Sequence, residues 1–311
     1  MLVYFNKTSG CCSNHYGRLT NKTMKGRTKN MAKDLTREQL WDAGAQFGHQ
    51  TKRWNPKMKP YIYGAKNKNH IIDLQQTIWR LEDVKKFVTN IGMKKEKIIF
   101  VGTKRSAKSA VKEAALRSGN FYINSRWLGG TLTNMKTISL RIKALWNIEN
   151  EEKTGKINLR PKKEQILIKK EKMKLEKTLG GIKQMHKLPA AMFVVDPKTD
   201  EIAVKEARKL RIPVIAICDT NVDPDMVDFV IPANDDIQES VNIITNYIVD
   251  VYADAAGFKM QPSTLKVVAQ KREERPQGQR PSGPGRSYNT NSSRTDNNEE
   301  NSTATNVSVD Q

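Results

Sequence analysis

Five short apolar runs separated by helical patterns constrain the fold of this chain more than any other feature of its sequence. The runs expected to form strands lie at residues 97–101, 121–123, 191–195, 213–217 and 228–231. Between them, apolar residues recur every three or four positions, which predicts amphipathic helices at 78–91, after Ser106, after Asp200 and at 237–255. Strands that are apolar on both faces and alternate with helices indicate a parallel sheet covered on both sides. The sequence therefore predicts an α/β fold with a doubly wound, five-stranded parallel sheet of the flavodoxin or Rossmann type.

The loops that follow the strands of such a sheet form its natural ligand crevice. In this chain they contain Gly102-Thr103-Lys104-Arg105, Asn124-Ser125-Arg126, Asp196-Pro197 and Cys218-Asp219-Thr220. These polar and charged residues make the carboxyl edge of the sheet the first place to look for a binding site.

Two further helical patterns interrupt the alternation between residues 134 and 186. Each has a narrow apolar seam, and a polar turn at 153–156 followed by Pro161 separates them, which predicts an antiparallel coiled-coil hairpin. Residues 133–188 hold 15 basic and 6 acidic residues. The outer faces of this arm are either solvated or placed against phosphate, and the pattern leaves both interpretations open.

These patterns divide the chain into five predicted segments. Residues 1–33 form a basic leader that we expect to be disordered or not translated, and we hypothesise that the native chain starts at Met31. The Pro, Gly, Ser, Asn and Thr-rich residues 259–311 are expected to be a disordered polar tail. Between them lie the N-terminal segment with the first half of the α/β domain (34–132), the hairpin arm (133–186) and the second half of the domain (187–258).

Charge is strongly segregated along the chain. The formal net charge is +21, yet residues 1–188 hold 41 basic and 14 acidic residues while residues 189–258 hold 5 and 13. A basic surplus of this size is the electrostatic footprint of a phosphate-rich partner, so nucleic acid is the expected ligand. The acidic half is expected to face solvent or basic protein neighbours.

Cysteine usage and hydropathy indicate a cytoplasmic protein. The three cysteines give no disulfide framework, which favours a reducing compartment, and Cys218 lies in an apolar run as a buried thiol would. No stretch has the roughly 18–20 apolar residues that a membrane span needs, so no membrane partner is predicted. The basic, acid-free leader also resembles a transit peptide, an alternative that the sequence leaves open.

Basic and aromatic residues are interleaved between positions 47 and 70. Such a segment offers phosphate contacts and flat stacking faces that looped or single-stranded RNA uses. In the simpler interpretation, the aromatic rings pack onto the sheet while the lysines face water. We expect a mixture in which Phe47, Trp54 and Tyr61 are mostly structural and Lys52, Arg53 and Lys57 mostly contact phosphate.

An enzymatic alternative comes from Gly102-Thr-Lys-Arg-Ser-Ala107-Lys108-Ser109, which follows a strand and opens a helix. It differs from a phosphate-binding P-loop because Ala107 stands where the motif needs glycine. The strand that ends in Asp196 adds an acid of the kind that holds magnesium in nucleotide hydrolases. The competing interpretations are a helix start whose Lys104, Arg105 and Lys108 contact RNA phosphate, and plain surface.

Metal and nucleophile patterns are weak. His49, His70 and His186 lack zinc-site spacing, and no Ser or Cys has an activating partner in the sequence. Asp219, Asp223, Asp225 and Asp228 are close enough for a divalent ion, but the central Gly and closing Glu of a calcium loop are missing, so helix capping and loop hydrogen bonds are the favoured explanation. No cofactor, metal or small-molecule substrate is predicted, and whether a divalent ion binds near Asp196 and Asp219 stays open.

Several strings together resemble one family. They are Ala45-Gln-Phe-Gly-His-Gln-Thr-Lys52, Trp54-Asn-Pro-Lys-Met58, Asn69-His-Ile-Ile-Asp-Leu74, Phe100-Val-Gly-Thr-Lys-Arg105, Arg126-Trp-Leu-Gly-Gly-Thr-Leu-Thr-Asn134, Leu179-Gly-Gly-Ile-Lys183, and 189–213 with Glu206 inside it. In this order, over about residues 34–258, the chain closely resembles protein two of the bacterial small ribosomal subunit. The string around Lys104 is the family's own pattern, which argues against the P-loop.

The resemblance implies a structural component of the 30S subunit with no catalytic activity. It implies binding to 16S ribosomal RNA at the junction of head and body and to neighbouring small-subunit proteins, in many bacteria including the mRNA-binding first protein. A nucleotide hydrolase and a free-standing RNA chaperone are the other two classes weighed. The predicted RNA-binding residues are His49, Lys52, Arg53, Trp54, Lys57, Lys66, Lys68, Lys104, Arg105, Lys108 and Arg126.

Overall fold

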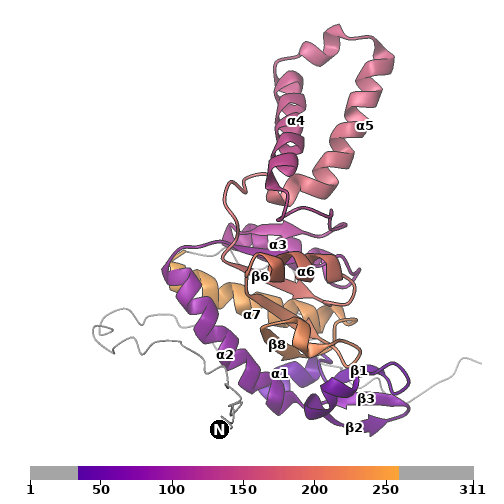
Figure 1. Cartoon of the computed structure of the whole chain (residues 1–311), viewed down its shortest axis with the longest axis vertical. Coiled ribbons are helices and arrows are strands. Elements are labelled where there is room, and N and C mark those ends of the chain that lie inside the picture. Colours follow the sequence, from indigo (N-terminus) through magenta and orange to yellow (C-terminus); the bar gives the residue numbers. More distant parts are fainter. Residues whose placement is uncertain (1–33, 259–311) are drawn as a thin grey trace, which may run out of the picture. The chain divides into compact units, whose positions relative to one another are not determined.

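The structure, a computed structural model, describes residues 34–258 (Figure 1). Its central sheet has five parallel strands in the order β5 (Phe121–Ile123), β4 (Ile98–Val101), β6 (Ala191–Val195), β7 (Val214–Cys218) and β8 (Phe229–Pro232). The predicted doubly wound parallel sheet is confirmed. The strand order reverses its direction between β4 and β6, and this switch point is where such sheets open a crevice at their carboxyl edge.

The strands are apolar on both faces because helices cover both sides of the sheet. Ile98 and Phe100 of β4 pack into a core with α2 (Leu74–Met93), α3 (Lys108–Ser118) and α7 (Gln238–Ala256). Ile99 and Val101 point the other way, into a second core that includes α6 (Glu201–Lys209) and the start of α4 (Met135–Lys153). The predicted helices around the strands are thereby confirmed. Cys218, at the end of β7, is the buried thiol expected from its apolar run, and burial raises its pKa.

A small N-terminal sheet was not predicted. After α1 (Arg37–Asp42) come β1 (Phe47–Gln50), the 3-10 turn η1 (Pro56–Tyr61), β2 (Ile62–Lys66) and β3 (Asn69–Ile72), which pair antiparallel in the order β1-β3-β2. Its strands are short, half-exposed and mixed in polarity, so they lack a clear alternating pattern. The turn between β2 and β3 is a two-residue hairpin in which Asn67 and Lys68 both have positive φ, 52° and 65°.

Two long helices lie between β5 and β6. Figure 1 shows α4 and α5 (Lys162–Leu179) side by side, with η2 (Lys156–Leu159) between them in the chain. Ion pairs of Lys172 with Glu152 and of Arg160 with Glu151 join the two helices and their connection. Coiled-coil geometry and the predicted domain boundaries stay predictions.

The connection back to β6 depends on a glycine. In η3 (Gly180–Ile182), a Cβ atom added at Gly181 would lie 2.1 Å from the backbone oxygen of Tyr122. No side chain fits at that distance, so the close approach of η3 to β5 explains the second glycine of the Leu-Gly-Gly string. The remaining turn, η4 (Pro224–Met226), links β7 to β8.

Some predictions lie outside the described residues. These are the character of the leader at 1–33, the proposed start at Met31 and the polar tail at 259–311. Among residues 34–258, no helix combines the length and apolar character needed to cross a membrane.

Candidate nucleic-acid interface

Four predicted RNA-binding residues lie together at one end of the N-terminal sheet. Lys66 and Lys68 belong to the β2–β3 hairpin, and Lys52 and Arg53 belong to the turn that follows β1. The Thr51 amide donates to the Lys68 carbonyl oxygen at 2.9 Å, so the turn and the hairpin are adjacent. All four side chains are exposed, and within the described residues none has an ion pair or a side-chain hydrogen bond. They form a group of uncompensated cations, which we call the basic end.

The aromatic and basic residues next to the basic end differ in how far they are exposed or paired within the protein. Trp54 is 36% exposed and its ring centroid lies 5.3 Å from that of His70, so one part of the indole packs while another is open for stacking. Phe47 is 51% exposed, which shows it to be less structural than expected. The Lys57 ammonium lies 2.9 Å from Asp223 Oδ2 and 2.6 Å from Asp225 Oδ2, so part of its charge is compensated within the protein.

A second basic group lies at the carboxyl edge of the main sheet. Arg105 precedes α3, Lys108 is its first residue, and Arg126 follows β5, the strand next to β4. The three side chains are exposed and have no ion pair with a described residue. Their placement beside a helix start suits phosphate contacts, although their role as RNA contacts stays a prediction.

The loop between β4 and α3 does not have the geometry of a phosphate cradle. The Thr103 amide and hydroxyl both donate to the Asp200 carboxylate, at 3.2 and 3.0 Å. The amides of Ala107 and Lys108 donate to the Lys104 carbonyl oxygen. Since the amides of Thr103, Ala107 and Lys108 already have acceptors within the protein, they are not available to bind a phosphate, which supports the interpretation that the string is not a P-loop.

Lys104 is turned into an acidic cluster. Its ammonium lies 2.8 Å from Asp235 Oδ1, 2.6 Å from Asp236 Oδ1 and 3.9 Å from Asp196 Oδ2. Burial disfavours the charged ammonium, but these carboxylates outweigh that effect and raise the pKa of Lys104. Unlike Arg105 and Lys108, Lys104 is engaged inside the protein.

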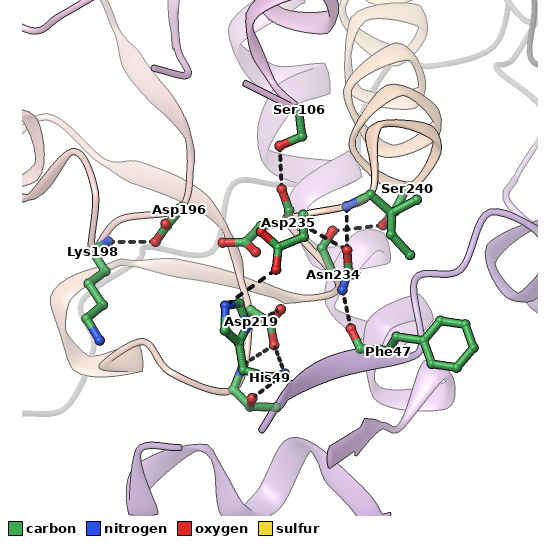
Figure 2. A network of polar contacts seen from close by, with 12 residues as sticks. Phe47, His49, Ser106, Asp196, Lys198, Asp219, Asn234, Asp235 and Ser240 are labelled. Atoms are coloured by element: carbon green, nitrogen blue, oxygen red, sulfur yellow. Dashed lines mark hydrogen bonds and ion pairs between the residues drawn. The ribbon is translucent and has the colours of Figure 1, made fainter. Parts of the chain in front are cut away.

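His49 belongs to the same cluster. Its Nδ1 lies 2.7 Å from Asp219 Oδ2 and its Nε2 lies 3.5 Å from Asp236 Oδ2. Its backbone amide also donates to Asp219 Oδ1 and to the Thr220 hydroxyl. The contact with Asp219 raises the pKa of His49 above its ordinary value despite partial burial. Figure 2 shows His49, Asp219 and Asp235 meeting at the ends of their strands.

The carboxylates of this cluster are crowded and buried. Asp196, Asp219 and Asp235 follow β6, β7 and β8, and each is almost fully inaccessible to water. Burial, followed by the nearby charges of Asp219 and Asp196, raises the pKa of Asp235 to about 7. We define the acidic cluster as Asp196, Asp219, Asp235 and Asp236 together with His49 and Lys104.

Asn234 fixes the loop that carries two of these acids (Figure 2). Its side-chain oxygen accepts from the amides of Asp236 at 3.0 Å and Ile237 at 2.6 Å, which fixes the turn immediately before α7. Its side-chain nitrogen donates to the Phe47 carbonyl oxygen. Asn234 thus ties β1 to the end of β8 and sets the direction of the Asp235 and Asp236 side chains.

Glu206 organises the loop that leads from β5 to α4. Its Oε1 accepts from Trp127 Nε1 at 3.1 Å and from the Gly130 amide at 2.7 Å. Its Oε2 accepts from the amides of Leu132 and Thr133 and from the Thr133 hydroxyl, at 3.0, 3.1 and 3.1 Å. Burial would raise the pKa of Glu206, but these donors outweigh it and lower the pKa. One carboxylate therefore explains most of the Arg-Trp-Leu-Gly-Gly-Thr-Leu-Thr string.

The expectation that the acidic half of the chain faces solvent or other proteins is corrected in part. Asp196, Asp200, Glu206, Asp219 and Asp235 are all buried. They satisfy loop amides or pair with His49 and Lys104, which belong to the basic half. Part of the opposite charge of the two halves is therefore compensated inside the protein, by ion pairs between them.

Asp235 and Asp236 are absent from the predicted site residues, although they follow the last strand and so lie at the same carboxyl edge of the sheet. The capping alternative for the Asp219–Asp228 stretch is borne out at two positions. Asp223 accepts from the Asp225 amide, and Asp228 accepts from the Val214 amide.

The profile of the family described as "Ribosomal protein S2" matches residues 40–255, and this range spans the sheet, both charged groups and the Glu206 loop. The chain belongs to the ribosomal protein S2 family. It is 70% identical over 236 residues to the "Small ribosomal subunit protein uS2" of Spiroplasma citri, a match covering 76% of this chain and 66% of the relative, just under two thirds of its length. The proteins of that name from Mesoplasma florum and Mycoplasma capricolum are 66% and 69% identical over 257 and 245 residues. These matches cover 83% and 79% of this chain and 96% and 84% of the relatives.

Membership in the ribosomal protein S2 family confirms the resemblance found in the sequence strings. The family is one of ribosomal proteins and not of enzymes, in agreement with the prediction of a non-catalytic protein. The short strings that carried the resemblance correspond to the β1 turn, η1, the β4–α3 loop, the Glu206 loop and η3.

Proposed function

We propose that this chain is a structural constituent of the small ribosomal subunit that binds 16S ribosomal RNA at the junction of head and body. Its relatives are named as small-subunit proteins, and this supports assembly into the same particle. The expected location is the ribosome in the cytoplasm. Neighbouring small-subunit proteins, among them the mRNA-binding first protein, are the expected protein partners.

The observation that carries the proposal is the basic end. Lys52, Arg53, Lys66 and Lys68 are exposed and uncompensated within the described chain, beside the partly open ring of Trp54. Uncompensated cations release counterions from a nucleic acid when they bind it, and this release supplies most of the affinity for phosphate. Arg105, Lys108 and Arg126 extend the positive charge along the carboxyl edge of the main sheet.

His49 and Lys104 have a different role in this proposal. Because both are held by carboxylates of the acidic cluster, they position the N-terminal sheet on the main sheet and do not offer charge to RNA. Lys57 is intermediate, since Asp223 and Asp225 compete with phosphate for its ammonium.

Sedimentation of a native lysate on a sucrose gradient tests the assignment. The chain is expected to travel with small subunits at low salt and to leave them as salt is raised. A chain found only at the top of the gradient at low salt would contradict the proposal and favour a free RNA chaperone.

A double variant then tests the footprint. Lys52→Ala with Arg53→Ala should weaken binding to 16S RNA and lower the salt slope by about one per lost phosphate contact. Lys85→Ala with Lys86→Ala is the matched control, because these two lysines of α2 already pair with Asp34 and Asp83. Equal slopes for the two variants would remove Lys52 and Arg53 from the footprint.

A further inference from the structure

Four side chains from separate parts of the chain bring metal-ligand atoms close together. A ring nitrogen of His49 and one carboxylate oxygen each from Asp219, Asp235 and Asp236 all lie within 4.8 Å of one another. His49 comes from β1, Asp219 follows β7, and the other two follow β8 (Figure 2). The amides of Asp236 and Ile237 donate to the Asn234 side-chain oxygen, and these bonds hold the loop of Asp235 and Asp236 in place.

One buried oxygen in this group has no partner. Asp235 is fully buried, and while its Oδ1 binds Lys104, its Oδ2 accepts no hydrogen bond from any described residue. An unpartnered carboxylate oxygen away from water is strongly unfavourable unless a charge or donor meets it. The unpartnered oxygen therefore points to a ligand that residues 34–258 do not supply.

Charge balance identifies the sign of that ligand. The acidic cluster contains four carboxylates, Asp196, Asp219, Asp235 and Asp236, against the one ammonium of Lys104 and the imidazole of His49. Even a protonated His49 leaves the cluster with excess negative charge at a largely buried place. A divalent cation removes that excess and allows His49 to bind as a neutral imidazole.

We propose that His49, Asp219, Asp235 and Asp236 bind a divalent transition-metal cation of the Zn²⁺ or Mn²⁺ type. An imidazole with several carboxylates suits these ions, whereas Ca²⁺ and Mg²⁺ prefer oxygen ligands alone. A pocket of about 260 Å³ lined by Lys104, Arg105, Ser106, Asp236 and Gln238 gives the ion a path from solvent to Asp236.

Such an ion would join the N-terminal sheet to the main sheet. Its ligands come from β1 on one side and from the ends of β7 and β8 on the other. An ion that binds only the folded chain stabilises it by RT ln(1 + c/Kd) at a free ion concentration c, so the thermal midpoint of unfolding should rise with the ion concentration. The basic end is carried on the same N-terminal sheet, so the ion also holds the RNA-facing residues in position.

Calorimetric titration of the chelator-treated full chain with ZnCl2 or MnCl2 tests the proposal. Cys11, Cys12 and His15 are themselves soft ligands, so the titrations use a chain with Cys11→Ser, Cys12→Ser and His15→Ala. We expect saturable binding of a single ion and a raised thermal midpoint. Asp235→Asn should weaken the affinity by more than about 100-fold, beyond the effect of losing an outer-shell partner.

Two further variants make the outcome decisive. Asp42→Asn removes an exposed carboxylate outside the cluster and should leave the affinity unchanged. Asp236 is 55% exposed, so Asp236→Asn should fold even where Asp235→Asn does not, and it should also weaken binding. Absence of saturable binding by either ion, or binding that both cluster variants leave unchanged, would overturn the proposal and leave an ion-pair network that is complete without metal.

Discussion

The cations around the β2–β3 hairpin are exposed and have no ion-pair partner among residues 34–258, whereas the carboxylates after β6, β7 and β8 are buried beside His49 and Lys104. Both groups are charged, but in the proposed function only the first binds RNA. The second is already used to hold the N-terminal sheet against the main sheet. The comparison shows that net charge along a sequence identifies the class of partner, while burial and pairing decide which residues contact it.

The largest effect is expected from removing the carboxylate that organises the β5–α4 loop. Glu206→Ala leaves the amides of Gly130, Leu132 and Thr133 without their acceptor. Because each buried donor without a partner costs about 1–3 kcal/mol, unfolding in urea should show a loss on the order of 3 kcal/mol or more.

Glu201→Ala on the same helix is the matched control for Glu206. Glu201 is exposed, and its one ion pair among the described residues is with Lys205 at 2.6 Å, an i,i+4 contact worth about 0.3 kcal/mol. A similar loss for the two variants would mean that buried acids in this half are no more structural than exposed ones.

A smaller loss is expected at the joint between the two sheets. Asn234→Ala removes the acceptor of the Asp236 and Ile237 amides and the donor to the Phe47 carbonyl oxygen, and should cost about 2 kcal/mol in the same urea assay. Asn150→Ala, at an exposed position on α4, should be near neutral. If Asn234→Ala were also neutral, the acidic cluster would not depend on this loop.

Lowering the pH should reduce the free energy of unfolding, because Glu206 takes up a proton. The donors around Glu206 lower its folded pKa below the ordinary 4.5, so its contribution to stability is present above that pH. The contribution is lost as the pH falls through the folded pKa, when the carboxylate takes up a proton. Urea unfolding between roughly pH 5 and 3 should fall more steeply for the wild type than for Glu206→Gln, and parallel curves would exclude this role.

The smallest expected effect is the difference in the salt slope of RNA binding between variants of two exposed lysines, Lys52 and Lys57. Lys52→Ala should lower the salt slope of RNA binding by about 0.7–0.9, the value of one phosphate contact. Lys57→Ala should lower it by less, because Asp223 and Asp225 already hold its ammonium. Filter binding over a salt series measures both, and a larger change for Lys57 would show that its internal ion pairs open on the RNA.

The main sheet could be predicted because its strands are apolar on both faces. Every residue of β4, β6 and β7 is buried, so each run stands out from the polar loops around it. The helices were equally clear, since the buried positions of α2 and α7 recur every three or four residues. Local pattern and tertiary burial agree in these elements.

The N-terminal sheet could not be predicted for the opposite reason. Its strands are half-exposed, and its hairpin turn places Asn67 and Lys68 in the left-handed region without the glycine that usually marks such a turn. The sheet is held by long-range contacts, such as the Asn55 amide donating to the Thr220 carbonyl oxygen at 2.7 Å. Contacts of that kind leave no periodic trace in the sequence.

The sequence predicted the residue types of the candidate interface, but not which of the basic residues are exposed and which are paired inside the protein. Lys52, Arg53, Lys66 and Lys68 follow from a basic, aromatic-rich stretch, and the structure finds them exposed. Lys104 and His49 come from equally basic strings, yet the fold brings carboxylates from about 90 to 190 residues further along the chain onto them. Sequence reasoning cannot separate the two cases, because pairing at that distance depends on the strand order of the sheet.

The salt dependence of 16S RNA binding tests the central claim most directly. Replacing Lys52, Arg53, Lys66 and Lys68 by alanine should lower the slope of log affinity against log salt by about three, at 0.7–0.9 per contact. Replacing four exposed lysines elsewhere, Lys86, Lys94, Lys205 and Lys209, should leave the slope close to that of the wild type. Equal slopes for the two quadruple variants would contradict the claim that the basic end is where this chain contacts RNA.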